Sequence, residues 1–211
     1  MAERTSAPGR PRSSEASGRI LRATVELLAE GGAAGVSVDA VAARAGVSRP
    51  TVYRRWKDRT ELIAAAVREA FAQANPEAPD TADPLADLVT VLSNTIRLLT
   101  GTPLGRVIAG LVSELPRSPE LAAALREVER ERREILHEVL RRAEELGRLR
   151  LTDVGLAIEV LLGPVYLRLL VTGDPVPSDL AAELAALVVA PTGSGLLPER
   201  PQEIENDGHE P

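Results

Sequence analysis

The chain has little of the chemistry from which enzymes and metal sites are built. It contains no cysteine, one lysine, two histidines and four aromatic residues among its 211 residues. The absence of cysteine excludes disulfides and thiolate metal ligands and favours a reducing compartment, so we expect the protein in the cytoplasm. Glycine-rich phosphate loops after a strand are missing too. The chain has a single Glu-x-x-His pair, Glu134 and His137, and it stands in a run of alternating Glu and Arg that is typical of a solvated helix face. We therefore expect no catalytic residues, no metal, no cofactor and no enzymatic activity.

Long uncharged apolar runs are also absent. The longest apolar stretch, Val154–Val171, contains Glu159 and Arg168, so no run of about eighteen uncharged apolar residues exists. Residues 1–14 are polar and carry three arginines, unlike a signal peptide. We therefore expect no membrane contact.

Charge is present, and it is unevenly distributed. The net charge is −6, but residues 1–60 hold eleven Lys and Arg against six Asp and Glu, a balance of +5. Residues 61–211 hold fourteen against twenty-five, a balance of −11. A basic amino-terminal part on an acidic body indicates a contact with a polyanion at the basic end, although an arginine-rich solvated surface would look the same.

Helical periodicity covers most of the chain, and no segment alternates as a β-strand does. We predict an all-α fold of about nine or ten helices. Proline, glycine and cap residues place them at about 15–30, 38–45, 49–56, 58–74, 85–99, 103–115, 128–146, 152–171 and 178–189, with another start signal at Ser118-Pro119. Three prolines in residues 75–84 indicate a linker. The predicted domains are a disordered basic arm (1–14), a helix-turn-helix domain (15–62), a helical ligand-binding and dimerisation domain (63–190) and a disordered acidic tail (191–211).

The most informative segment is residues 37–57. Ser37 and Ser48 are cap residues for two short helices, and Gly46 stands where the turn between them needs a positive φ. Asp58 caps the next helix, with Glu61 in the capping-box position. Two short helices at a wide angle form a helix-turn-helix, whose second helix enters the major groove of DNA.

Apolar and basic positions divide this segment into two functions. The residues expected to pack inward are Val38, Val41, Ala42, Val47, Val52 and Trp56. The rest of the second helix is left for solvent or a ligand, and six of the seven charges between Arg44 and Arg59 are positive. We therefore predict that the second helix presents a basic face to DNA.

The same segment resembles the DNA-binding domain of tetracycline-repressor-type (TetR/AcrR) regulators. The resemblance covers about residues 17–65 and rests on L-L-A-E-G-G at 27–32, V-A-A-R-A-G-V-S at 41–48, T-V-Y-R-R-W at 51–56 and E-L at 61–62. The runs at 132–143 and 161–173 resemble, more loosely, one ligand-domain subgroup of that family. Two positions depart from the family pattern: Trp56 replaces a phenylalanine, and Pro50 replaces a small residue at a place where the first helical turn tolerates proline.

The resemblance implies specific DNA contacts. It implies that Arg49 and Thr51 face the major groove, with Arg49 and Arg54 as candidate base readers, because arginine can bind guanine through two hydrogen bonds. Phosphate contacts set the affinity and its salt dependence. The complete predicted DNA-binding set is Ser37, Arg44, Ser48, Arg49, Pro50, Thr51, Tyr53, Arg54, Lys57 and Arg59. The simpler reading of Arg44 and Arg55 is that they are solvated.

The carboxy-terminal half is predicted to mediate dimerisation and to bind a small molecule. The helix at 153–171 is apolar on nearly all sides, so it is either a central core helix or part of an interface between subunits. The resemblance implies the second: a homodimer through the helices near 153–171 and 178–189, which would bind a palindromic double-stranded operator. It also implies an unidentified small-molecule effector, for which the polar candidates are Asn94, Arg97, His137 and Tyr166.

The sequence thus predicts a DNA-binding transcriptional regulator. The resemblance implies that it is a ligand-responsive repressor, as most members of the family are. The alternative is a dimeric small-molecule-binding helical protein without DNA-binding activity, and the intact basic motif argues against it. The scarcity of aromatic residues argues against a pocket that stacks a large planar drug, and an aliphatic ligand or no ligand at all remains open.

Overall fold

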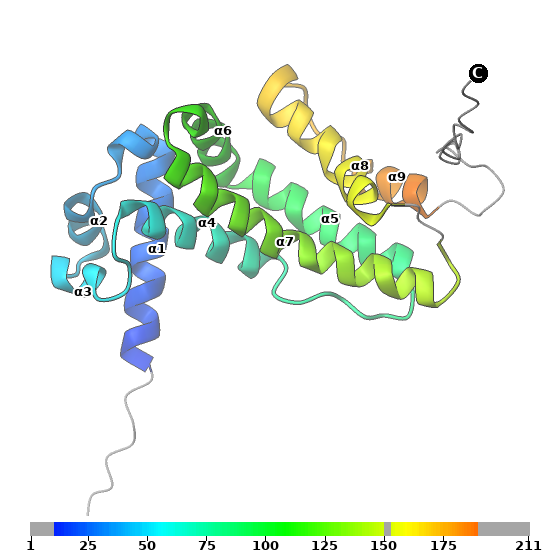
Figure 1. Cartoon of the computed structure of the whole chain (residues 1–211), viewed down its shortest axis with the longest axis horizontal. Coiled ribbons are helices and arrows are strands. Elements are labelled where there is room, and N and C mark those ends of the chain that lie inside the picture. The colour runs from blue at the N-terminus through cyan, green and yellow to red at the C-terminus, as the bar shows by residue number, and fades with distance from the viewer. Residues whose placement is uncertain (1–10, 150–152, 190–211) are drawn as a thin grey trace, which may run out of the picture.

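The computed structural model describes residues 11–149 and 153–189, and every statement on structure concerns these residues. Within them the chain is all-α, with nine α-helices, three short turns of other helix types and no strand. The predicted fold class and helix number are confirmed. Figure 1 shows a small amino-terminal cluster of α1 to α3 joined through α4 to an elongated bundle of the remaining helices.

The amino-terminal cluster contains α1 (Pro11–Gly31), α2 (Val38–Ala45), α3 (Arg49–Tyr53) and the first turns of α4 (Arg59–Ala74). A 3₁₀ turn, η1 (Ala33–Gly35), joins α1 to α2. The α1 helix begins four residues before the expected start at Glu15, and proline is well suited to a first helical position. Residues 1–10 of the predicted arm lie outside the described residues.

The α3 helix is three residues shorter than the predicted 49–56. The backbone amides of Arg55 and Trp56 both donate to the carbonyl of Val52, so the last turn tightens and the helix ends. The chain then enters α4 through the Asp58 cap, whose side chain accepts a hydrogen bond from the amide of Glu61.

The larger bundle contains α5 (Pro84–Gly101), α6 (Leu104–Glu114), α7 (Pro119–Glu145), α8 (Val154–Leu167) and α9 (Leu180–Val188). A 3₁₀ turn, η2 (Leu115–Arg117), precedes α7, and a π-helical turn, η3 (Arg168–Thr172), follows α8. The α7 helix starts nine residues before the predicted Val128, because Ser118 caps it by accepting from the amide of Leu121. Asp153 caps α8; the predicted cap, residue 152, lies outside the described residues, as does the tail at 191–211.

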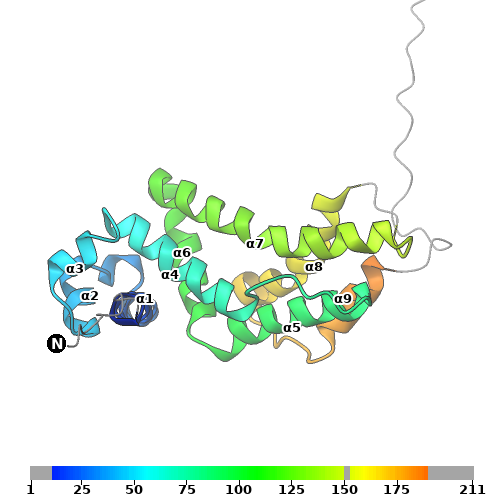
Figure 2. The same ribbon diagram turned by 90° about the horizontal axis from the view of Figure 1, so that it is seen from below.

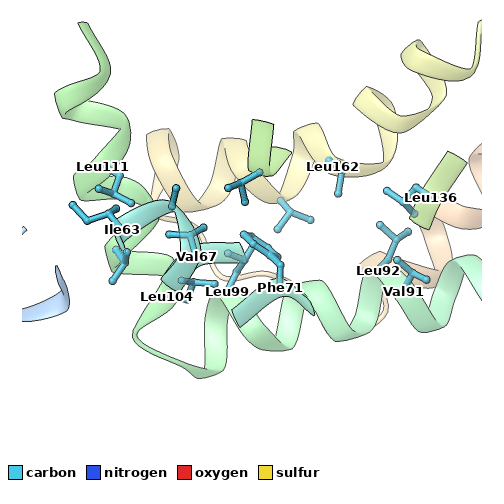
Figure 3. Packing of buried hydrophobic residues seen from close by; sticks show 14 of the residues in the cluster. Ile63, Val67, Phe71, Val91, Leu92, Leu99, Leu104, Leu111, Leu136 and Leu162 are labelled. Atoms are coloured by element: carbon cyan, nitrogen blue, oxygen red, sulfur yellow. The ribbon is translucent and has the colours of Figure 1, made fainter. Parts of the chain in front are cut away.

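The α4 helix connects the two parts, and its buried face contributes to the core of the larger bundle. Figure 3 shows α4 side chains among those of α5, α6, α7 and α8. The labelled side chains are Ile63, Val67, Phe71, Val91, Leu92, Leu99, Leu104, Leu111, Leu136 and Leu162, and all ten are buried. The predicted boundary between residues 62 and 63 therefore falls inside a continuous helix, so a displacement of its carboxy-terminal end would be transmitted to the amino-terminal cluster.

The predicted linker is held against the bundle. Arg142 donates to the carbonyl of Pro79 at 2.7 Å and pairs with Asp80 at 3.0 Å. The hydroxyl of Thr81 donates to the buried carboxylate of Asp87 at 2.7 Å. Proline removes backbone donors from this segment, and side chains of α5 and α7 provide its contacts instead.

The α8 helix and η3 together form an apolar segment with much exposed surface. Val154–Thr172 is long and apolar enough, by length and composition only, to cross a membrane, and 28% of its most apolar stretch is buried. Leu167 and Val171 are 52% and 75% exposed. Figure 2 shows α9 toward the end of the molecule away from α1 to α3, and α8 between that end and the middle of the bundle. An exposed apolar face of this kind needs a covering surface.

Candidate nucleic-acid interface

The turn between α2 and α3 has the geometry that the sequence predicts. The hydroxyl oxygen of Ser37 caps α2 by accepting from the amide of Ala40 at 3.1 Å. Gly46 ends α2 in the left-handed region, with φ 65° and ψ 41°, and a Cβ is strained there. The amide of Val47 donates back to the carbonyl of Ala42 at 3.0 Å, which closes the turn.

The inner face of α3 is fully used for packing. Val52 is 0% exposed and lies in the same core cluster as Val41 and Ala42, with the half-buried Trp56 packed against that cluster. The opposite face carries Arg49, Pro50, Tyr53 and Arg54, which are all exposed. The buried position of Val52 agrees with the sequence prediction for this helix, and the DNA contacts of the exposed residues stay a prediction.

Arg49 has an acidic neighbour that the sequence prediction missed. Its Nε lies 2.5 Å from Oδ1 of Asp39 on α2, and both side chains are 61% exposed. Asp39 stands in the first turn of α2, where an acidic residue is favoured by the helix dipole, so from the sequence it looks like a simple helix-start residue. Only the angle between α2 and α3 brings the two charges together.

Two other arginines brace the motif against α1. Arg44 binds Glu30 through two nitrogens, each 2.9 Å from a carboxylate oxygen, and pairs with Glu26 at 3.3 Å. These hydrogen bonds raise the pKa of Arg44 above its ordinary value. Arg55 donates from Nε to the hydroxyl of Ser17 at 2.9 Å. A phosphate contact by Arg44 stays a prediction, and it would compete with these carboxylates.

Three cations of the motif lack such partners. No acidic partner for the charged groups of Arg54, Lys57 or Arg59 is found within 11–149 and 153–189, and all three are exposed. The backbone around them is well ordered by hydrogen bonds: Glu61 accepts from the amide of Lys57 at 2.7 Å, one residue before the expected capping-box position. Ser48 precedes α3, but its hydroxyl shares a hydrogen bond of 2.9 Å with the hydroxyl of Thr51 and does not make the predicted cap to a backbone amide.

A cavity of about 570 Å³ lies in the larger bundle, between α4, α6, α7 and the α8–η3 segment. Of the four predicted effector-binding residues, Tyr166 lines this cavity and the others do not. His137 and Arg97 are exposed. Asn94 donates to Oδ1 of the buried Asn75 at 3.0 Å, so its amide serves the α4–α5 contact. The four residues are not brought together.

The sequence prediction also missed Arg132, which lies beside this cavity with a side chain only 8% exposed. Its guanidinium lies over the rings of Phe71 and Tyr166, 4.9 and 5.7 Å from their centroids. Glu129 accepts from it at 2.7 Å. A signal existed in the sequence: Arg132 follows Val128 by four residues and precedes Leu136 by four, which puts it on the apolar face of α7.

Comparison with protein families decides what this architecture is. Residues 20–66 match the family described as bacterial regulatory proteins, tetR family, and residues 78–188 match the tetracyclin repressor-like C-terminal domain. The chain belongs to the TetR family. Its resemblance to that family, expected from the helix-turn-helix motif, is confirmed for both halves of the protein.

Individual TetR-family relatives agree with this assignment. The HTH-type transcriptional regulator YdeS of Bacillus subtilis is 33% identical over 178 residues, which cover 83% of this chain and 89% of YdeS. The TetR-family regulator SCO0332 has a solved structure that is 33% identical, with a TM-score of 0.66 over 83% of this chain and 97% of that one. FadR of Bacillus subtilis, solved in complex with stearoyl-CoA, shares the fold at 24% identity and a TM-score of 0.65, with 82% and 97% of the two chains covered.

The chain is therefore a DNA-binding transcriptional regulator and not an enzyme. TetR-family regulators bind DNA as dimers. The alternative of a small-molecule-binding protein without DNA-binding activity is set aside.

Proposed function

We propose that this TetR-family protein is a repressor that acts in the cytoplasm, binds a palindromic operator as a homodimer and releases it when a small molecule fills the 570 Å³ cavity. The observation that carries the DNA-binding part is the exposed face of α3, held in place by the buried Val52. Arg49 and Arg54 lie on that face with Tyr53, which is 50% exposed. In this arrangement arginines can reach base edges while the tyrosine hydroxyl reaches a phosphate.

The remaining residues of the proposed DNA-binding surface have supporting positions. Lys57 and Arg59 lie at the start of α4, next to the end of α3, and their free charges suit phosphates on either side of the groove. Ser37 and Ser48 precede α2 and α3, where hydroxyls and backbone amides can meet the DNA backbone. The proposed surface is Ser37, Arg44, Ser48, Arg49, Pro50, Thr51, Tyr53, Arg54, Lys57 and Arg59.

The dimer is proposed to form through α8, η3 and α9. Leu156 and Leu167 on α8, Val171 on η3 and Leu187 on α9 are each at least 40% exposed. We propose that the same face of a second copy covers this apolar surface. A membrane is the less suitable cover, because it would hold the α3 helices of a DNA-binding protein away from DNA. Two α3 helices would then meet two half-sites about 34–36 Å apart, or a multiple of the helical repeat.

The effector is proposed to act through α4. Val67 and Phe71 of α4 line the cavity, and the same helix begins at Arg59 beside the DNA-reading surface. A ligand that pushes on Val67 and Phe71 therefore moves the amino-terminal end of the helix, and with it the spacing between the two α3 helices of a dimer. Such a ligand stabilises the state with the wrong spacing and weakens operator binding.

The test of the DNA-binding proposal is a double variant, Arg49→Ala with Tyr53→Phe, measured on the operator found by genome-wide mapping of bound DNA. We expect a folded dimer whose operator affinity falls by about tenfold to several hundredfold, because a base contact and a phosphate contact are both removed. Arg97→Ala, an exposed arginine on α5, is the matched control. Equal operator affinity of the double variant and the wild type in a gel-shift assay would overturn the assignment.

A further inference from the structure

The cavity in the larger bundle has a mostly aliphatic wall. Val67 on α4, Leu111 on α6, Leu125 on α7 and Leu170 on η3 contribute to it from four sides. A wall of branched aliphatic side chains favours a hydrocarbon ligand, because binding buries apolar surface. Such a wall has no hydrogen-bond donors or acceptors that could orient the ligand. The shape of a ligand here is therefore set by packing and its orientation by the few polar groups at the edge.

The two aromatic rings at the cavity are already engaged. Phe71 and Tyr166 both line it, and the Arg132 guanidinium lies over each ring. Planar aromatic ligands gain affinity by stacking on free ring faces. One face of each ring is taken by Arg132, and Phe71 is only 7% exposed, so little ring surface is left for a planar ligand. A flexible hydrocarbon does not depend on stacking for its affinity, so this arrangement does not weaken its binding.

The charge at the cavity is positive. Glu129 is the acidic residue in its wall, and its carboxylate is held by Arg132 at 2.7 Å and Arg133 at 3.0 Å. Arg126, one turn earlier on α7, also lines the cavity and is exposed. Within the parts of the chain that the structure describes, no acidic side chain pairs with Arg126. A cationic ligand would thus find the carboxylate of Glu129 already paired and would be repelled by Arg126. An anionic ligand could pair with Arg126.

We infer that the effector is an amphiphile with a flexible aliphatic body, which fills the cavity, and one anionic head group, which binds Arg126. This inference rests on the proposed function, because it names the ligand class of the cavity assigned there. It excludes two other classes of effector: lipophilic cations and planar aromatic drugs.

Four probes test the inference by calorimetric titration of the full-length protein: decanoate, 1-decanol, decyltrimethylammonium and anthracene-9-carboxylate. Decanoate should bind most tightly, decanol more weakly and the cation at least about tenfold more weakly than decanoate, since like charges next to each other are costly. The planar anion should also bind more weakly than decanoate. Tightest binding of the cation or of the planar anion, or no binding of any probe, would overturn the inference.

Variants locate the head group. Arg126→Gln should weaken decanoate about threefold to tenfold, the range expected for a partly exposed charged hydrogen bond, and leave decanol unchanged. Arg130→Gln is the matched control, because Arg130 is an exposed arginine one turn further along α7 that does not line the cavity. An equal loss of decanoate binding in both variants would contradict a specific role for Arg126, since general surface charge would then explain the preference.

Fluorescence anisotropy of labelled operator separates this inference from the proposed function. If decanoate binds and does not release the operator, the ligand class is supported and the proposed response is wrong. If the cation releases the operator and decanoate does not bind, the ligand class is wrong and the proposed response stands. Release by decanoate that Arg126→Gln weakens supports both.

Discussion

The side chain of Arg49 is long and flexible, so a neighbouring group that restricts its conformation helps to direct its guanidinium to a base. Asp39 is such a neighbour, because its carboxylate pairs with Arg49. The Nε–Oδ1 distance of 2.5 Å positions the charge near the start of α3, where the groove would be read. An exposed pair of this kind contributes at most about 1 kcal/mol to stability, so its importance is in orienting Arg49. The carboxylate also repels nearby phosphates, which disfavours DNA that offers Arg49 no base to bind.

Asp39→Asn is predicted to relax the choice of DNA sequence. Affinity for non-specific DNA should rise about twofold to fivefold, because the substitution removes a negative charge that repels the DNA phosphates. The ratio of operator to non-specific affinity should fall. Competition gel shifts with operator and scrambled DNA measure both quantities. Asp174→Asn makes the same charge change on an exposed residue far from α3, and a matching effect in that control would show that net charge alone is responsible.

Two glycines constrain the helices for different reasons, and both constraints come from the backbone. Gly46 has a φ of 65°, and a Cβ there would have no atom within 4 Å, so its requirement is conformational. A Cβ on Gly105 of α6 would lie 2.1 Å from the carbonyl oxygen of Leu99 and 3.1 Å from Leu169 Cδ1. The end of α5 and the η3 turn therefore approach α6 closely only because that position has no side chain.

The two alanine substitutions are predicted to differ in cost. Gly46→Ala should lower the free energy of unfolding by about 1–2 kcal/mol, the cost of the left-handed conformation. Gly105→Ala should lower it by about 3 kcal/mol or more, since backbone must move. Gly110→Ala is the control on α6, where a Cβ meets nothing within 4 Å and alanine favours the helix by up to about 1 kcal/mol. Urea denaturation orders the three, and a Gly105→Ala protein as stable as Gly110→Ala would contradict the close approach.

The whole molecule separates a DNA-reading end from an apolar end, and its function as proposed needs two copies joined at the apolar end. Leu167→Glu places a charge on a residue that is 52% exposed in the single chain. We expect sedimentation velocity to show a monomer with unchanged helix content and operator affinity reduced at least about a hundredfold, because the two half-sites are then bound separately. Leu146→Glu changes a similarly exposed residue at the end of α7 that does not line the cavity, and this variant should stay dimeric. A dimeric Leu167→Glu protein would place the interface elsewhere.

The basic amino-terminal part of this bipolar molecule, and not its net charge of −6, should give it a salt-dependent affinity for DNA. In the proposed mode of binding, the counterions released by Lys57, Arg59 and their copies in the partner set the salt dependence of operator affinity. Four such phosphate contacts predict a loss of about a hundredfold in operator affinity between 50 and 200 mM salt. Fluorescence anisotropy at four salt concentrations gives the slope. A nearly flat slope would show that these cations do not touch phosphates.

The sequence by itself determined the all-α fold, the positions of most helices and the two faces of α3. These are local properties: caps such as Ser37 and Asp58, the glycine of the turn and the spacing of Val41 and Val52 act within a few residues. The start signal at Ser118-Pro119 coincides with the start of α7. The continuity of residues 119–127 with the helix predicted from Val128 was missed, because these residues are less clearly amphipathic than the charged run that follows.

Only the tertiary structure decided which charges meet and where a ligand fits. Arg49 lies next to Asp39 because α2 and α3 cross. Arg132 stacks on Phe71 and Tyr166 because α4, α7 and α8 converge. Asn94 binds Asn75 because α5 packs beside the carboxy-terminal end of α4. These contacts join residues from ten to about sixty positions apart, so they depend on how the helices are packed, and no local pattern encodes that packing.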